Sequence, residues 1–268
     1  MPQQAERGQM SSPKILTIDI ETAPLSVYAW GLWEQNVGVN QIKSEWRILS
    51  VAWKWLHEKK PFFVRAMVKD EKVDDAWVLA VIWGLLDKAD IVVAQNGQDF
   101  DIKKINARLV AEGYPPYSPI RVIDTKLVAK RHFGFTSNRL EWMGVNVGGS
   151  AKEEHRKFPG FELWKQCLAD NLAAWKEMAK YNVQDVLATE KLYLRLRPWI
   201  AGHPNVGTYV AADSHVCPKC GGRHLVRRGV ATTNTAVYLR YRCSDCGGWS
   251  RGRSTILTPR VSRSLLGN

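Results

Sequence analysis

Residues 14–21 read Lys-Ile-Leu-Thr-Ile-Asp-Ile-Glu, an apolar run that ends in two acidic residues. The β-branched residues of this run predict a strand over 14–20. Side chains alternate between the two faces of a strand, so Asp19 and Glu21 lie on one face at its carboxyl end. The sequence therefore predicts a pair of carboxylates at one edge of a sheet.

Strand and helix patterns alternate downstream of this run. We expect strands over 46–56, 61–67, 90–94 and 121–123, and helices over 73–88, 99–112 and 170–197. Strands that come first and then alternate with helices predict an α/β fold, with a mixed sheet flanked by helices. At about 150 residues per domain, a chain of 268 residues predicts one large domain and one small one.

Two further acidic motifs follow the first pair along the chain. Asn96-Gly-Gln-Asp-Phe-Asp101 comes directly after a predicted strand and opens a predicted helix. Tyr181-Asn-Val-Gln-Asp185 lies in the long predicted helix, where residues four apart share a face. A helical wheel puts Tyr181 and Asp185 at the rim of the buried face, beside an apolar stripe of Leu172, Trp175, Ala179, Val183 and Val186.

Other residues that could carry chemistry are interpreted as structural. Asp124 stands before Thr125 at a predicted helix start, which favours an N-cap over a metal ligand. Trp53 and Trp55 share a strand face with Val51, which favours a place in the core over stacking on a ligand.

The three acidic motifs, in this order, resemble those of the DEDD 3′–5′ exonucleases, which have a ribonuclease-H-like fold. The resemblance covers residues 14–205, and it is strongest to the branch related to the proofreading domains of family B DNA polymerases. It places the motif residues of that family on Asp19, Glu21, Asn96, Phe100, Asp101, Tyr181 and Asp185. The histidine variant of the last motif would need His at Lys180, so Tyr181 indicates the tyrosine branch, called DEDDy.

This resemblance implies phosphodiester hydrolysis with two Mg²⁺ or Mn²⁺ ions. Converging carboxylates repel one another unless cations neutralise them, and these hard cations prefer oxygen ligands. Asp19 would bridge both ions. Glu21 and Asp185 would complete the ligands of the ion that activates water, and Asp101 those of the other.

Substrate contacts follow from the same resemblance. The phenol of Tyr181 is neutral at pH 7, so it would orient the attacking water rather than act as a strong base. Asn96 and Leu25 would contact the terminal nucleotide. Single-stranded DNA is favoured over RNA as substrate, and a DNA polymerase or another replication or repair protein is a candidate partner.

Four cysteines form two C-x-x-C pairs near the C-terminus. Cys217 and Cys220 are separated by 22 residues from Cys243 and Cys246. This spacing predicts one structural Zn²⁺ held by four thiolates, while disulfides are disfavoured in a reducing cytoplasm. With a predicted strand over 236–242, the pattern predicts a zinc ribbon.

Positive charge is concentrated in the same part of the chain. Residues 213–268 contain ten basic and two acidic side chains, a net +8, out of +12 for the whole chain, and nine of the ten are Arg. Arg presents a forked set of donors that suits phosphate, and a basic module of this kind is typical of nucleic-acid binding. A basic segment without a ligand is the alternative. The expected contact residues are Arg227, Arg228, Arg240, Arg242, Trp249 and Arg251.

These patterns predict the following division of the chain. We expect a disordered N-terminus over 1–13, the exonuclease domain over 14–205, a linker over 206–214, the zinc ribbon over 215–254 and a basic tail over 255–268. The polar N-terminus has no apolar signal region, and the longest apolar run, 76–86, is far shorter than the ~20 residues that span a bilayer. We therefore expect a cytoplasmic protein with no membrane association, and the resemblance suggests a bacterial or phage-infected cell.

Two alternatives to an active exonuclease remain at this stage. The first is a catalytically inactive nucleic-acid-binding or replication-accessory protein on the same fold. The complete acidic set disfavours it. The second is a structure-selective endonuclease, which Tyr181 disfavours, and a substrate blocked at its 3′ end distinguishes this activity from the exonuclease.

Overall fold

The computed structural model describes residues 12–149, 157–210 and 214–267. The predicted disordered N-terminus lies outside the described residues except for Ser12 and Pro13, and so does part of the predicted linker. The chain divides into two compact units, one formed by residues 14–193 and one that contains residues 194–268. Within the described ranges, no helix combines the length and the apolar character needed to cross a membrane.

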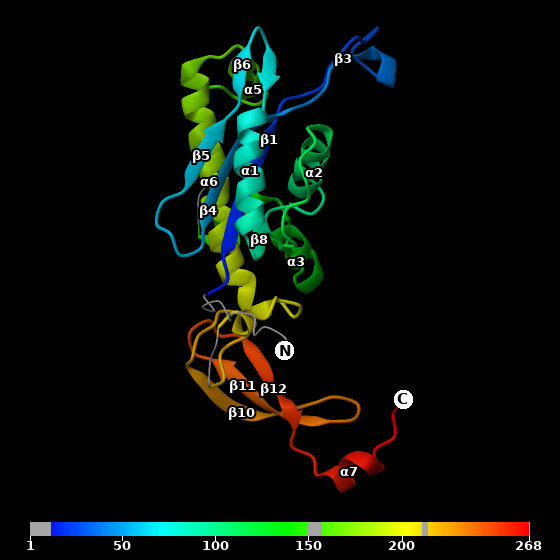
Figure 1. Ribbon diagram of the computed structural model, residues 1–268, viewed down its shortest axis with the longest axis vertical. Helices are drawn as coiled ribbons and strands as arrows, with labels where there is room; N and C mark the ends of the chain where they lie inside the picture. The colour runs from blue at the N-terminus through cyan, green and yellow to red at the C-terminus, as the bar shows by residue number, and fades with distance from the viewer. Residues whose placement is uncertain (1–11, 150–156, 211–213, 268) are drawn as a thin grey trace, which may run out of the picture. The chain divides into compact units, whose positions relative to one another are not determined.

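A five-stranded mixed sheet forms the centre of the first unit (Figure 1). Its strand β1 (Ile15–Thr22) pairs antiparallel with β4 (Ile48–Trp55) and parallel with β8 (Ile91–Ala94). The outer strands are β5 (Phe62–Arg65), antiparallel to β4, and β9 (Arg121–Asp124), parallel to β8. The predicted α/β fold with a mixed sheet is thus confirmed.

Helices cover both faces of this sheet because β1 alternates along its length. Leu16, Ile18 and Ile20 belong to a buried cluster shared with α1 (Ala76–Lys88) and α2 (Asp101–Ala111). The intervening residues, Asp19 among them, face α6 (Leu172–Leu196). Apolar residues of α6 and α5 (Glu162–Leu168) form a second buried cluster with Leu49 of β4.

The buried face of α6 differs from the predicted one. Leu172 is 66% exposed, so the predicted apolar stripe is wrong at its first residue. Asn182 is fully buried and Asp185 is 6% exposed, so both belong to the packed face. An ion pair between Lys54 Nζ and Glu190 Oε2, 2.7 Å apart, fixes the same helix to β4. Polar contacts with the sheet therefore extend the buried face of α6 beyond the expected apolar stripe, of which Trp175 and Val186 are buried.

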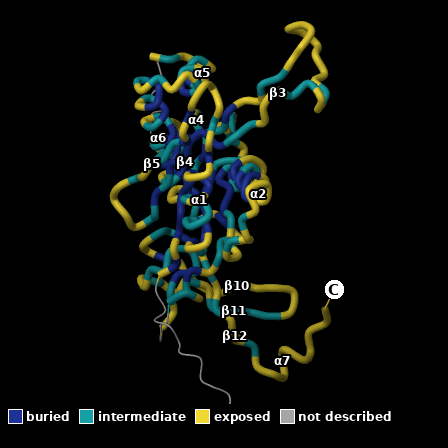
Figure 2. The backbone as a smooth tube through the Cα atoms, turned by 45° about the horizontal axis from the view of Figure 1, so that its top comes forward, coloured by how far each residue is buried: buried dark blue, intermediate teal, exposed yellow. Residues whose placement is uncertain are grey.

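Several short elements surround this core. The arm between β1 and β4 contains β2 (Ser26–Val27), the 3₁₀ turn η1 (Val39–Gln41) and β3 (Ile42–Ser44), and Figure 2 shows it as largely exposed. This arm was not predicted from the sequence. The remaining elements of the unit are β6 (Met67–Lys69), β7 (Lys72–Asp74), α3 (Thr125–His132), α4 (Leu140–Met143) and the π-helical turn η2 (Gly144–Gly148). Trp53 and Trp55 pack against the core, as predicted.

The second unit contains a three-stranded antiparallel sheet. Its order is β10 (Leu225–Thr232), β11 (Val237–Cys243) and β12 (Trp249–Thr255). The 3₁₀ turns η3 (Arg197–Trp199) and η4 (Val206–Thr208) precede the sheet. The short helix α7 (Pro259–Ser264) follows it, inside the predicted basic tail.

Asp124 caps α3, as predicted, and also organises the loop between β8 and α2. Its carboxylate accepts hydrogen bonds from the backbone N–H groups of Lys126 and Leu127 at 2.9 and 3.2 Å. It accepts two more from Asn96 and Gln98 at 3.0 and 3.1 Å. Four backbone donors therefore depend on one carboxylate that is only 3% exposed.

Replacing Asp124 with Ala tests this network. The variant loses a helix cap and leaves two loop N–H groups without their acceptor, so we expect the free energy of unfolding to fall by about 2 kcal/mol or more. Asp124→Asn keeps an acceptor oxygen, so its loss should be clearly smaller. Chemical denaturation provides the measurement, and an unfolding free energy equal to wild type in Asp124→Ala contradicts the assignment.

Candidate functional site

Three carboxylates from two elements meet at the carboxyl end of β1. Asp19 and Glu21 come from β1, and Asp185 comes from α6. One oxygen from each lies within 4.8 Å of the other two. This spacing suits ligands of a single cation, and the group matches the three residues assigned to one ion from the sequence.

Asp101 lies next to this group but is not part of it. It is the first residue of α2 and is 2% exposed. Its Oδ1 accepts a hydrogen bond at 3.1 Å from the N–H of Ile20, the residue between Asp19 and Glu21. The fourth predicted carboxylate is therefore fixed to the backbone of the strand that carries the first two.

Burial and mutual repulsion perturb these acids. Burial raises the pKa of Asp19 well above its ordinary value, and the carboxylates of Asp101, Glu21 and Asp185 raise it further. Burial also raises the pKa of Asp101 to about 7, with a smaller contribution from Asp124. A divalent cation among the carboxylates would stabilise their charged forms and remove this cost.

Tyr181 lies one helical turn before Asp185. Burial raises the pKa of the Tyr181 phenol above its ordinary value, and the neighbouring carboxylate of Asp185 raises it further. The ring packs edge-on against Trp164 with centroids 6.0 Å apart, which fixes its direction. The phenol keeps its proton at neutral pH, so it is not a base, and its O–H donates a hydrogen bond to the Asp185 carboxylate.

The two residues expected at the terminal nucleotide lie outside the carboxylate group. Asn96 adopts φ +64, and its side-chain oxygen accepts a hydrogen bond from Lys126 Nζ at 3.0 Å. The next residue must be glycine, because a Cβ on Gly97 would lie 2.4 Å from the Cβ of Ala94. Leu25 is 46% exposed. The contacts of Asn96 and Leu25 with substrate stay predictions.

Sequence reasoning missed Asn182 as a member of this site. Its side-chain N–H₂ donates to Asp19 Oδ2 at 2.5 Å. The signal that could have found it is its position, one residue after Tyr181 and three before Asp185 on the same helix. As a polar residue it does not belong to the buried stripe that the sequence predicts.

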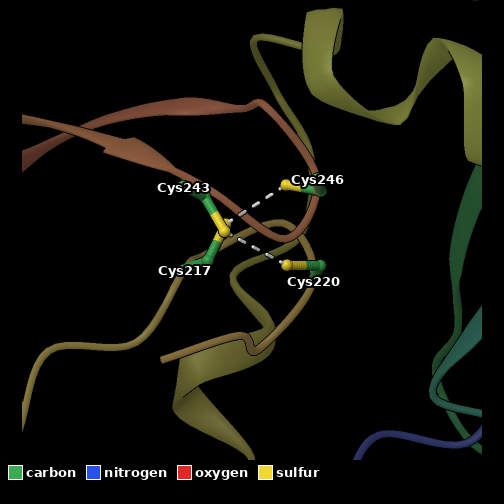
Figure 3. A group of neighbouring side chains, drawn as sticks. All are labelled: Cys217, Cys220, Cys243 and Cys246. Atoms are coloured by element: carbon green, nitrogen blue, oxygen red, sulfur yellow. Dashed lines mark hydrogen bonds between the residues drawn. The ribbon is translucent and has the colours of Figure 1, made fainter. Parts of the chain in front are cut away.

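The four cysteines of the second unit point toward one another (Figure 3). Sulfur–sulfur distances are 3.7 Å for Cys217 with Cys246 and for Cys220 with Cys243. Each C-x-x-C pair ends in a turn that donates a backbone N–H to sulfur, from Gly222 to Cys220 and from Gly248 to Cys246, both at 3.4 Å. Four soft sulfur donors at this spacing fit one tetrahedral metal ion.

The expected nucleic-acid contacts of this unit are all exposed, but they do not share one face. In the β11–β12 ladder Arg240 pairs with Arg251, and Arg242 pairs with Trp249. Paired residues lie on the same face, so these four form one basic aromatic face, with the Arg240 guanidinium 4.9 Å from the Trp249 ring centroid. Arg227 pairs with Tyr241 and lies on the other face. The remaining expected contact, Arg228, offers its carbonyl to Arg240 Nε at 2.9 Å.

Comparisons with known proteins agree with this fold. The RNase_H_2 family model, described as RNase_H superfamily, matches residues 37–197, which include Asp101, Tyr181 and Asp185 but begin after Asp19 and Glu21. The chain is similar to the family B DNA polymerase from the hyperthermophilic archaeon Pyrobaculum calidifontis, with a TM-score of 0.51 and 16% identity. That similarity covers 70% of this chain and 25% of the polymerase chain. A search of curated proteins found no match.

The polymerase similarity at this identity shows a shared fold, and this chain spans about a quarter of that protein. The family model covers more than half of the 268 residues. Its match includes four strands of the mixed sheet, beginning at β4, together with α1, α2 and α6, which cover the two faces of that sheet. The chain belongs to the RNase H superfamily.

Proposed function

We propose that this protein is a metal-dependent 3′–5′ exonuclease that removes nucleotides from the 3′ end of single-stranded DNA in preference to RNA. The observation that carries the proposal is the three-carboxylate group of Asp19, Glu21 and Asp185, with Asp101 beside it. On an RNase H superfamily fold, this donor set fits divalent cations that bind a phosphodiester.

Each acidic residue has a defined part in the proposed reaction. Asp19, Glu21 and Asp185 would hold one Mg²⁺ or Mn²⁺ ion, and Asp19 and Asp101 a second. Bound ions would lower the pKa of the attacking water and stabilise the leaving 3′-oxygen. Tyr181 would orient that water by a hydrogen bond, and its own pKa is too high for it to act as the base.

We propose a different metal and a different role for the thiol cluster. Cys217, Cys220, Cys243 and Cys246 would hold one Zn²⁺, and four thiolates leave no position open for a reactant. The metal would therefore be structural and would stabilise the ribbon on which the basic aromatic face depends. That face suits a single strand, since Arg side chains contact phosphates and Trp249 stacks on a base.

The central test is digestion of 5′-labelled single-stranded DNA and RNA, each with and without Mg²⁺. We expect a ladder that shortens from the 3′ end, faster on DNA, and no cleavage without the metal. Asp19→Asn removes a proposed metal ligand. Its cleavage rate should therefore fall by more than the ~100-fold that is typical when a residue hydrogen-bonded to a metal ligand is replaced. Asp99→Asn is the matched control, because Asp99 is an exposed acid that lies two residues before Asp101 and pairs with Lys103.

The outcomes separate the candidate functions. Cleavage of a substrate blocked at its 3′ end indicates an endonuclease. Binding without cleavage under all metal conditions indicates an inactive nucleic-acid-binding or replication-accessory protein. Normal turnover by Asp19→Asn would disprove the metal assignment.

Protons should stabilise the metal-free protein through Asp101. Its pKa is raised from 3.8 to about 7 in the folded chain, so the folded state binds a proton more tightly than the unfolded state. This stabilisation is complete below about pH 4 and is lost as the pH rises through about 7. We expect the melting temperature of the metal-free protein to fall between about pH 5 and about pH 8, and less steeply in Asp101→Asn.

Mg²⁺ should oppose this fall in melting temperature with rising pH, because it binds the ionised carboxylates. Its stabilising effect should therefore be larger at the higher pH, and differential scanning fluorimetry measures both trends. An identical pH dependence in wild type and Asp101→Asn contradicts the assignment.

The two faces of the ribbon give a matched test of nucleic-acid binding. Arg251→Ser lies on the basic aromatic face, and Arg227→Ser removes the same charge from the other face. Arg251→Ser should lose a phosphate contact and so bind a long single strand more weakly. The number of counterions released on binding, which sets how steeply affinity falls with salt, should decrease by about one. Fluorescence anisotropy at two salt concentrations measures both effects. Equal losses in the two variants would show that only net charge matters.

A further inference from the structure

Asn182 joins three elements at the edge of the carboxylate group. It lies on α6 and is 0% exposed. Its side-chain nitrogen donates to Asp19 Oδ2 at 2.5 Å and to the backbone oxygen of Asp19 at 3.2 Å. Its side-chain oxygen accepts from Ser50 Oγ of β4 at 3.0 Å. One amide therefore links α6 to two neighbouring strands of the sheet, β1 and β4.

The direction of the amide is fixed by this pattern. The backbone oxygen and the ionised carboxylate of Asp19 can only accept, so the nitrogen end of Asn182 must face Asp19, and its oxygen end then accepts from the Ser50 hydroxyl. A flipped amide would direct its oxygen at a carboxylate, which offers no proton when ionised. Leaving a buried amide unpaired is costly, so both bonds are strongly favoured together.

Because Asn182 lies between Tyr181 and Asp185 in the sequence, its bond to Asp19 affects the geometry of the carboxylate group. Tyr181 precedes it, and Asp185 follows three residues later on the same helix. A bond from Asn182 to Asp19 thus sets the distance between the helix that carries Tyr181 and Asp185 and the strand that carries Asp19 and Glu21. Amides hydrogen-bonded to a ligating carboxylate fix its orientation and raise the affinity for metal.

We propose that Asn182, oriented by Ser50, is a positioning residue that fixes the Asp19 carboxylate and the spacing of α6 from β1 for metal binding. The inference rests on the proposed function, because it concerns the same carboxylates. Asn182 itself does not contact the reacting atoms. Its donation to Oδ2 leaves Oδ1 and the second lone pair of Oδ2 for cations.

The experiment measures Mn²⁺ binding to the full chain, without nucleic acid, from the electron paramagnetic resonance signal of free Mn²⁺. Asn182→Leu keeps the branched shape of the side chain and removes the bond to Asp19. We expect its Mn²⁺ affinity to fall by about 10- to 100-fold, the range for outer partners of metal ligands. Ser50→Ala keeps the bonds from the amide to Asp19 but removes the donor that holds its oxygen end, so its loss should be smaller, and Ser50→Thr should restore the wild-type affinity.

A control on the same helix separates positioning from stability. Thr189 is 1% exposed on the buried face of α6, and its Oγ1 has no hydrogen-bond partner among the described residues. Thr189→Val should therefore leave Mn²⁺ affinity unchanged. Melting temperatures of all variants identify effects of folding, and in the nuclease assay excess Mn²⁺ should restore turnover by Asn182→Leu.

The outcomes distinguish this inference from the proposed function. If the wild-type protein binds Mn²⁺ but does not cleave nucleic acid, the exonuclease proposal is disproved. The comparison of Mn²⁺ affinities between wild type and Asn182→Leu still tests the role of Asn182. Folded Asn182→Leu with wild-type Mn²⁺ affinity overturns the inference. If Asn182→Leu does not fold, an unchanged affinity in folded Ser50→Ala overturns it. Wild type that binds no Mn²⁺ overturns both.

Discussion

Mutual repulsion among carboxylates at the carboxyl end of β1 is the constraint on which the candidate site depends. Asp19 is partly buried beside Glu21, Asp101 and Asp185, and the negative charge of each of these three carboxylates raises its pKa. Bringing these carboxylates together costs free energy, and the cost is offset where positive charge balances their negative charge. Divalent cations do this most directly, because they supply positive charge and accept the oxygen ligands that the group offers.

Neutral hydrogen-bond donors hold the crowded acids in place. Asn182 contacts Asp19 from α6, and the N–H of Ile20 contacts Asp101 from β1. The loop that leads into Asp101 is in turn held by Asp124, which satisfies four backbone donors. Neutral donors fix geometry without cancelling the charge that a metal needs. The fold therefore sets the geometry of the site, and the negative charge of its carboxylates remains available to bind a cation.

The central strands and the long helix could be predicted because their signals are local. The β-branched run of β1 and the cap at Asp124 depend on neighbouring residues, and both predictions are confirmed. The arm with β2 and β3 could not be predicted, because its strands are two and three residues long. The place of Asn182 in the site could not be predicted, because it depends on contacts with distant parts of the chain, among them the hydrogen bond from Ser50, 132 residues away in the sequence. The roles of the acids and the thiols stay predictions.

The claim that the carboxylate group is a divalent-cation site is tested most directly by anomalous diffraction from crystals of the protein grown with Mn²⁺. We predict a strong anomalous peak bounded by Asp19, Glu21 and Asp185, a second on the Asp101 side of Asp19, and loss of the first peak in Asp185→Asn. Well-ordered carboxylates with no anomalous peak between them at saturating Mn²⁺ would contradict it.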